Sequence, residues 1–294
     1  MTLCWDCGGD TTAVGCQILH KEEGPVTIKL AEKPCSHSFW NFVLHAGITF
    51  NVTAIAGQRQ IAERLSFTNA GQEGTAAQSF SCFIYNVHFM NCSWTKGPAA
   101  PDDVQYFLYV QDSKKQWGRE CPHYVRESGT HVGCHVPDVS SWASQAYFLV
   151  NGTSRHAKIQ FFDSFLWLKT IERCNPPGNI SVLCNATHCR ILWEKPRTRR
   201  RLSDRDFQYQ LQVQQEIELP GDLGNKYHLL SPQPRAAHTL RIRAADTRVL
   251  QWSAWSQPVT FGSQESRGRF VYVYVLVVLG TVVCVLAVSC LIQR

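Results

Sequence analysis

Four cysteines in the middle of the chain constrain the fold more than any other feature of the sequence. Cys82 lies close to Cys92, and Cys121 lies close to Cys134. This spacing suits two short-range disulfides in a β-rich domain, and such bonds form only in an oxidising compartment. The sequence therefore predicts the pairs Cys82–Cys92 and Cys121–Cys134 in a domain made for export.

Five acceptor motifs for N-linked glycosylation agree with export. Each has the form Asn-x-Ser/Thr, and each predicts a surface position for a glycan. The acceptors are Asn51, Asn91, Asn151, Asn179 and Asn185. One motif could arise by chance, but five beside a disulfide pattern favour an exported protein.

The chain has 13 cysteines, so further pairs are expected. The predicted pairs are Cys184–Cys189 and Cys7 with either Cys16 or Cys35. Cys4 and Cys174 are the candidates for an unpaired thiol, because neither belongs to a recognised pair.

Before residue 262, polar and apolar residues alternate in short runs bounded by Gly, Pro, Asn and Asp, and no stretch keeps a helical repeat. The clearest runs are Phe207–Val213 and Thr239–Ala245. In the first, the apolar side chains point to one face of a strand and the glutamines to the other. Both runs predict strands of a two-sheet sandwich, so this part of the chain is expected to be all-β.

An uncharged run of 23 residues, Phe270 to Ile292, follows the last predicted strand. A helix of this length crosses about 30 Å of hydrocarbon at about 1.5 Å per residue. Tyr272 and Tyr274 stand at one end, where amphipathic rings favour the headgroup zone. The run predicts a single transmembrane helix. The cysteines and glycosylation motifs put residues 1–269 outside, as in a single-pass type I protein of the plasma membrane.

Composition predicts the boundaries between modules. The small, polar segment 69–78 reads as a linker, and Pro176 and Pro177 interrupt strand pairing. The predicted parts are an N-terminal sandwich at 1–76, which lacks its opening strand, a second at 77–174, a third at 175–262, a stalk at 263–269 and the membrane helix at 270–292.

Other function classes find little support in the sequence. The net charge of +6 is spread along the chain, and its one dense basic run, at 197–205, reads as a solvated loop rather than a nucleic-acid-binding face. Cys4 and Cys7 have the spacing of a redox pair, but no helix pattern follows them. Cys184 and Cys189 lack the second ligand pair of a zinc site. We therefore expect no enzyme activity, no cofactor and no metal.

The most specific motif is W-S-x-W-S, made by Trp252, Ser253, Trp255 and Ser256. Guanidinium groups stack between tryptophan rings, and each cation–π contact stabilises the fold by about 0.5–2 kcal/mol. Arg241 and Arg243 lie two apart on the preceding predicted strand and present their side chains to one face. We expect both arginines to stack with the two tryptophans in a ladder that stabilises the fold and does not bind ligand.

Four cysteines in one sandwich, a proline-containing hinge and a W-S-x-W-S box in the next sandwich resemble the type I cytokine receptor family. The match covers residues 79–262. The resemblance implies fibronectin III or immunoglobulin-like sandwiches, with a four-helix cytokine bound against the elbow between the second and third sandwiches. It also implies recruitment of a shared beta subunit and signalling through kinases on cytoplasmic tails. The rival interpretation is a non-signalling decoy receptor or an adhesion-type fibronectin III membrane protein.

The resemblance also directs attention to two loops of the third sandwich, Glu194–Asp206 and Asp246–Gln251. Arginine beside large apolar groups is typical of binding hot spots. The candidate cytokine contacts are Arg248, Val249, Leu250, Lys226 and Arg197. Because no signalling segment follows the membrane run in the sequence, we expect the chain to bind a cytokine but not to signal by itself.

Overall fold

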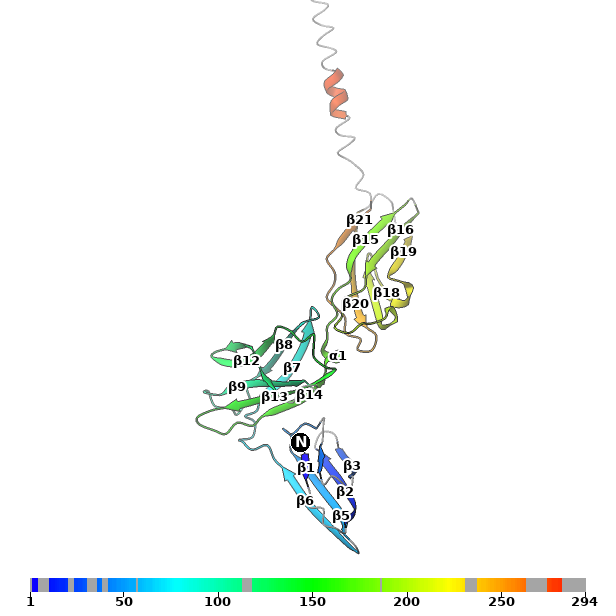
Figure 1. Ribbon diagram of the computed structural model, residues 1–294. Helices are drawn as coiled ribbons and strands as arrows, with labels where there is room; N and C mark the ends of the chain where they lie inside the picture. The colour runs from blue at the N-terminus through cyan, green and yellow to red at the C-terminus, as the bar shows by residue number, and fades with distance from the viewer. Residues whose placement is uncertain are drawn as a thin grey trace, which may run out of the picture. The chain divides into compact units, whose positions relative to one another are not determined.

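The computed structural model describes residues 2–4, 11–20, 24–30, 36–38, 42–56, 58–112, 118–185, 187–230, 237–262 and 274–281. The chain divides into two compact units, Met1–Arg173 and Cys174–Arg294. All described sheets are antiparallel (Figure 1). The predicted all-β class is therefore confirmed, and the sheets are consistent with tandem sandwiches.

The first unit begins with a four-stranded sheet in the order β3-β2-β5-β6 (Figure 1). Its strands are β2 (Thr11–His20), β3 (Gly24–Leu30), β5 (Ile48–Ala56) and β6 (Arg59–Phe67), and a separate pair is formed by β1 (Thr2–Cys4) and β4 (Ser36–Ser38). The buried side chains of this sheet include Cys16, Ile18, Ile48 and Phe50. Strand alternation places Cys16 on the same inner face as Ile18.

Cys16 is a free thiol that is 1% exposed, and burial raises its pKa. The Cys7–Cys16 alternative is therefore wrong: Cys16 serves as a small apolar side chain of the core. The Cys7–Cys35 alternative lies outside the described residues. Cys4 is a free, exposed thiol.

The rest of the first unit is a sandwich of two four-stranded sheets, ordered β11-β12-β8-β7 and β10-β9-β13-β14. Their strands are β7 (Gln78–Tyr85), β8 (Phe89–Thr95), β9 (Gln105–Asp112), β10 (Arg119–Glu120), β11 (His123–Glu127), β12 (Thr130–Val136), β13 (Gln145–Thr153) and β14 (Phe162–Trp167), followed by the short helix α1 (Leu168–Ile171). Ile84, Met90, Tyr106, Leu108 and Phe148 are fully buried between the sheets.

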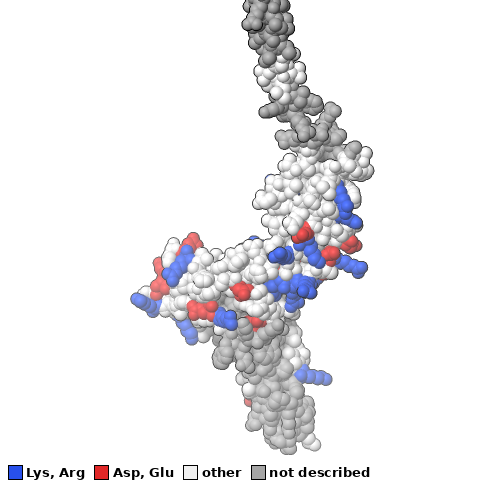
Figure 2. Space-filling view, turned by 45° about the horizontal axis from the view of Figure 1, so that its top comes forward, with Lys and Arg blue, Asp and Glu red and all other residues white. Residues whose placement is uncertain are grey.

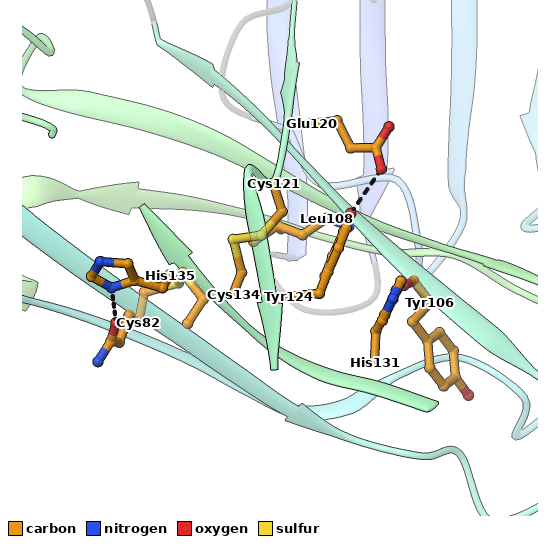
Figure 3. The surroundings of a disulfide bond; sticks show 11 residues. Cys82, Tyr106, Leu108, Glu120, Cys121, Tyr124, His131, Cys134 and His135 are labelled. Atoms are coloured by element: carbon orange, nitrogen blue, oxygen red, sulfur yellow. Dashed lines mark hydrogen bonds between the residues drawn. A yellow bond between two sulfur atoms is a disulfide. The ribbon is translucent and has the colours of Figure 1, made fainter. Parts of the chain in front are cut away.

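Two disulfides lie in this sandwich and have the pairing that the sequence predicts. Cys82–Cys92 joins β7 to β8 at directly opposed positions. Cys121–Cys134 ties the segment after β10 to β12, and Tyr124 stands beside it (Figure 3). The Tyr124 hydroxyl accepts a hydrogen bond from the Leu108 N–H at 3.0 Å and donates to Glu120 at 3.3 Å. Burial raises the pKa of this phenol, which keeps it a neutral donor.

The second unit holds a sandwich of a three-stranded sheet, β15-β16-β19, and a four-stranded sheet, β18-β17-β20-β21. Its elements are β15 (Gly178–Cys184), β16 (His188–Glu194), η1 (Asp204–Asp206), β17 (Phe207–Gln212), β18 (Glu216–Pro220), η2 (Gly221–Leu223), β19 (Lys226–Leu230), β20 (His238–Asp246) and β21 (Val259–Phe261), where η marks a 3-10 helix. The Cys184–Cys189 disulfide joins β15 to β16. Both strands that alternation predicts, Phe207–Val213 and Thr239–Ala245, are present as β17 and β20.

Residues 274–281 are helical and belong to the run from Phe270 to Ile292. Among the described residues, none of the helices has the length and apolar character needed to cross a membrane. Most of the predicted span lies outside the described residues.

Candidate functional site

The W-S-x-W-S box of the second unit pairs with β20 as a strand would. The N–H of Ser253 donates to the Ala244 carbonyl at 2.7 Å, and the N–H of Ser256 donates to the Ile242 carbonyl at 2.9 Å. In return, the two serine hydroxyls accept hydrogen bonds from the backbone N–H groups of Ala244 and Ile242, at 3.1 and 3.0 Å. Both serines are buried. Serine is needed at both places because a buried backbone N–H must have an acceptor.

Arg243 lies between the two tryptophans of the box. Its guanidinium carbon is 5.1 Å from the ring centre of Trp252 and 4.4 Å from that of Trp255. The Nε–H donates to the side-chain oxygen of Gln210 on β17 at 2.6 Å. This guanidinium therefore has two ring contacts and a fixed hydrogen-bond acceptor.

Arg241 does not take part in the stack. It is exposed, and within residues 237–262 the structure records no cation–π contact for it. The register explains the difference: the serines of the box bond to Ile242 and Ala244, so the residue between them, Arg243, stands beside both rings. The prediction of a ladder with two arginines is therefore wrong for Arg241.

Polar side chains continue the stack across the sheet toward β18. The Gln210 amide donates to Glu216 at 2.9 Å and to Glu218 at 3.4 Å. Gln210 is only 6% exposed although it belongs to the outer face of β17, because Arg243 and these carboxylates lie around it. The alternation pattern alone gave no sign that this glutamine is buried.

The candidate binding loops meet at one end of this sandwich. Asp206 is the last residue of η1, and its carboxylate accepts hydrogen bonds from both the N–H and the hydroxyl of Ser203 at 2.8 Å. Its carbonyl accepts the N–H of Thr247 at 2.9 Å, which joins loop 194–206 to loop 246–251. A side chain at Gly221 would collide with the carbonyls of Asp204 and Phe207, so glycine allows η2 to pack against η1. The two loops thus form one connected surface.

Arg248 is held in place within this surface by Asp246. Its Nε and Nη2 donate to the two carboxylate oxygens of Asp246 at 2.9 and 2.6 Å. The Arg248 side chain remains 46% exposed, whereas that of Asp246 is 13% exposed. Val249 is half-buried, and Leu250 is 64% exposed. A fixed cation is therefore followed, two residues further along the same loop, by an exposed apolar side chain.

The other two candidate residues belong to different segments from Arg248. Arg197 is exposed in loop 194–206, while Lys226 opens β19 in the opposite sheet and pairs with Leu192. Lys and Arg side chains gather on this end of the sandwich and are interspersed with acidic side chains (Figure 2).

Sequence reasoning missed a depression of about 420 Å³ beside the loops. Arg205, Phe207, Pro220, Asp222 and Thr247 contribute to its lining. It forms because η1, the end of β18 and the start of loop 246–251 come together, and these segments lie far apart in the sequence. Its lining combines apolar side chains with one basic residue, Arg205, and two acidic residues, Glu218 and Asp222.

A buried carboxylate in the first unit was also missed. Asp163 on β14 accepts hydrogen bonds from the backbone N–H groups of Leu44 and His45 at 2.8 Å, from the Tyr147 hydroxyl at 2.8 Å, and stands 2.8 Å from His45 Nδ1. Burial raises the pKa of Asp163, but the hydrogen bonds from His45, Leu44 and Tyr147 lower it, and the net shift is downward. This ionised side chain connects the loop before β5 to the sandwich.

Comparison with known proteins places these features in one class. Residues 79–171 match the family model described as interleukin-6 receptor alpha chain, binding, and residues 1–68 match that of the IL-3 receptor alpha chain N-terminal domain. The first match covers the disulfide-bonded sandwich, and the second covers the sheet before it.

Two curated relatives that align with most of the chain are both receptor alpha subunits. The mouse granulocyte-macrophage colony-stimulating factor receptor subunit alpha is 31% identical over 100% of this chain and 78% of its own length. The human interleukin-5 receptor subunit alpha is 28% identical over 86% of this chain and 66% of its own length. The chain belongs to the cytokine receptor family, together with these alpha subunits.

Proposed function

We propose that the chain is a cell-surface receptor subunit that binds granulocyte-macrophage colony-stimulating factor and recruits a common beta subunit, whose assembly starts signalling by kinases on cytoplasmic tails. The observation that carries the proposal is the fixed Arg248 beside the exposed Leu250, in a sandwich of the cytokine receptor family. The ligand is assigned by similarity to the mouse granulocyte-macrophage colony-stimulating factor receptor subunit alpha, which aligns with the whole chain.

Arg248, Val249 and Leu250 are the proposed centre of the binding surface. The Asp246 carboxylate holds the guanidinium in one orientation, so less side-chain entropy is lost when a ligand binds. A ligand that suits this surface presents an acidic group next to an apolar patch. Arg197 and Lys226 are proposed as outer contacts, where an exposed charge mainly raises the association rate.

The proposed topology is a single-pass type I protein of the plasma membrane, with residues 1–269 outside and Phe270–Ile292 as the span. The helical conformation of residues 274–281 supports this assignment. Of the five proposed glycan acceptors, Asn151, Asn179 and Asn185 are exposed, and Asn51 and Asn91 are half-buried. Those exposures suit extracellular attachment of glycans.

The rival function is a decoy that binds the cytokine without signalling. Cells that carry the full chain with the beta subunit distinguish the two functions. The proposal predicts cytokine-dependent phosphorylation of the kinases only when both subunits are present. Surface binding of the cytokine with no phosphorylation in these cells would support the decoy and contradict the signalling part of the proposal.

A further inference from the structure

The outer face of the β11-β12-β8-β7 sheet in the first unit carries a row of unusual composition. His123 pairs with His135, His135 pairs with Asn91, and Asn91 pairs with Phe83, each directly across neighbouring strands. Directly opposed residues of an antiparallel pair point to the same face, so the four side chains form one line across the sheet. The core residues Cys82 and Cys92 point to the other face.

Aromatic rings along this face contact one another in a continuous series, here called the outer aromatic stripe. It runs through Phe83, Tyr85, Phe89, His135 and His123, with successive ring centres 5.7, 5.5, 5.9 and 6.3 Å apart. His123 is exposed and the other four rings are half-buried. The ring surface that stays exposed along this stripe is a candidate contact surface for an apolar group.

Asn91 stands inside the stripe, and its side-chain amide is held in one orientation. Its side-chain oxygen lies 2.7 Å from Nδ1 of His135, which fixes the amide plane. Its side-chain nitrogen takes part in no hydrogen bond among the described residues. The nitrogen is the atom that carries the sugar in N-linked glycosylation, and Asn91–Ser93 has the acceptor sequence. The attachment atom is therefore available while its neighbour is held.

We propose that the outer aromatic stripe is a docking surface for the chain's own glycan at Asn91, whose proximal sugar packs against Phe89 and Phe83. Phe89 precedes Asn91 by two residues on β8, at about 6.6–6.8 Å along the strand, and Phe83 lies opposite at about 4.5–5.5 Å between Cβ atoms. Both rings are within reach of the first sugar, but the guanidinium carbon of Arg173 already lies 3.7 Å from the centre of the Phe83 ring, so Phe89 offers the more accessible ring. The C–H face of a pyranose is apolar, so packing it on a ring removes apolar surface from water.

Asn51 provides the contrast. It is also half-buried on a strand, but the residues opposite are Gln17 and Arg64, and its neighbours at two positions along β5 are Thr49 and Thr53. None of these is aromatic, so a glycan there gains no ring contact. The proposal rests on the export of the chain that the proposed function requires, but it does not depend on the identity of the cytokine.

The test compares Ser93→Ala with Thr53→Ala in the full chain, made in mammalian cells and purified in detergent. Each change removes the Ser or Thr hydroxyl of one Asn-x-Ser/Thr motif and leaves the asparagine in place. We expect peptide mass spectrometry to find a glycan on Asn91, and Ser93→Ala to lower the melting temperature by about 2–4 °C, the shift that one modest contact gives in a protein of this size. Thr53→Ala is expected to shift it by less. Trimming the Asn91 glycan to its first sugar should leave the melting temperature unchanged.

A double-mutant cycle isolates the ring contact. In the Phe89→Ala background, Ser93→Ala should cost no more than its hydrogen bond to the Ser81 hydroxyl, and an equal cost in both backgrounds would overturn the proposal. If Phe89→Ala does not fold, NMR of the glycosylated chain decides instead: protons of the proximal sugar at Asn91 should be shifted upfield by the ring, and random-coil shifts would overturn it.

Two other outcomes also contradict the proposal. One is an unmodified Asn91 in a chain that reaches the cell surface. The other is a Phe89→Ala variant that loses association with the beta subunit while Ser93→Ala still lowers its melting temperature by the same amount. That result would make the stripe a protein-binding face. Cytokine binding is measured separately on the same samples, so a failure of the proposed function is not mistaken for a failure of this inference.

Discussion

The guanidinium carbon of Arg243 lies 4.4 Å from the ring centre of Trp255. This contact ties the W-S-x-W-S box to the outer face of β20, while the serine hydroxyls tie it to the backbone of the same strand. The box thus pairs with the part of β20 that β21 does not cover, and the candidate binding loop Asp246–Gln251 is the segment that leads into it. We therefore expect a change in the box to alter the geometry of that loop.

Replacing Arg243 with alanine should destabilise the second unit. The change removes two ring contacts of about 0.5–2 kcal/mol each and leaves the Gln210 oxygen without its donor, so we expect a loss of about 2–4 kcal/mol in the free energy of unfolding. Urea unfolding and the amount of chain at the cell surface measure the effect. Arg241→Ala is the matched control on the same strand and should cost less than about 0.5 kcal/mol. Equal effects of the two variants would contradict the assignment.

The sequence identified this box and its neighbouring strand but not which arginine is used. Both arginines alternate onto the outer face, and the pattern treats them alike. The choice depends on the register between the box and β20, which the bonds of Ser253 and Ser256 set. That register is set by contacts between two segments, so the alternation of polar and apolar residues within one segment does not predict it.

Asp163→Asn should loosen the connection between the loop before β5 and the sandwich of the first unit. The amide keeps one acceptor oxygen but loses the charge that Leu44, His45 and Tyr147 surround. We expect a cost of about 1–3 kcal/mol, the usual penalty for a buried polar group that loses its partner. Hydrogen exchange at the amides of Leu44 and His45 measures it. Unchanged protection of these amides would show that the carboxylate does not hold the loop.

The same carboxylate gives a pH dependence of known sign. The pKa of Asp163 is lower in the folded chain than in the unfolded chain, so its contribution to stability is complete above the unfolded value of about 3.9 and is lost as the pH falls below that value. Between about pH 4 and pH 2, the free energy of unfolding measured with urea should fall more for the wild type than for Asp163→Asn. Parallel pH curves for the two proteins would contradict the downward shift.

Removing Cys121–Cys134 by a double change to alanine should cost about 3 kcal/mol, and removing Cys184–Cys189 about 2 kcal/mol, because the second bond closes a shorter loop of the unfolded chain. Thermal unfolding of each double variant beside the wild type measures both. A larger cost at Cys184–Cys189 would mean that effects in the folded state outweigh loop entropy.

Arg248→Ala should weaken cytokine binding by at least about tenfold, equivalent to about 1.4 kcal/mol. Asp246→Asn should weaken it less, because Arg248 remains present but is no longer held by a charged partner. Surface plasmon resonance on the purified full chain measures both, with Arg241→Ala as the control for loss of an exposed positive charge. Unchanged affinity in Arg248→Ala would remove this residue from the proposed contacts.

Local chemistry made the strands, the short-range disulfides and the box predictable. Cys82–Cys92 needs only two neighbouring strands, and β17 and β20 show their inner faces by alternation. Asp163 was unpredictable because its donors at residues 44 and 45 lie on another part of the chain and nothing around it marks the contact. The free Cys16 was missed for a similar reason: its place in the core follows from the register of β2.

The central claim is tested most directly by the binding of granulocyte-macrophage colony-stimulating factor to cells that display the full chain, with and without the common beta subunit. We predict saturable binding to the chain alone, higher apparent affinity when the beta subunit is present, and loss of binding in Arg248→Glu at equal surface expression. Absence of saturable binding to a wild-type chain that is folded and displayed at the surface would contradict the assignment of this ligand.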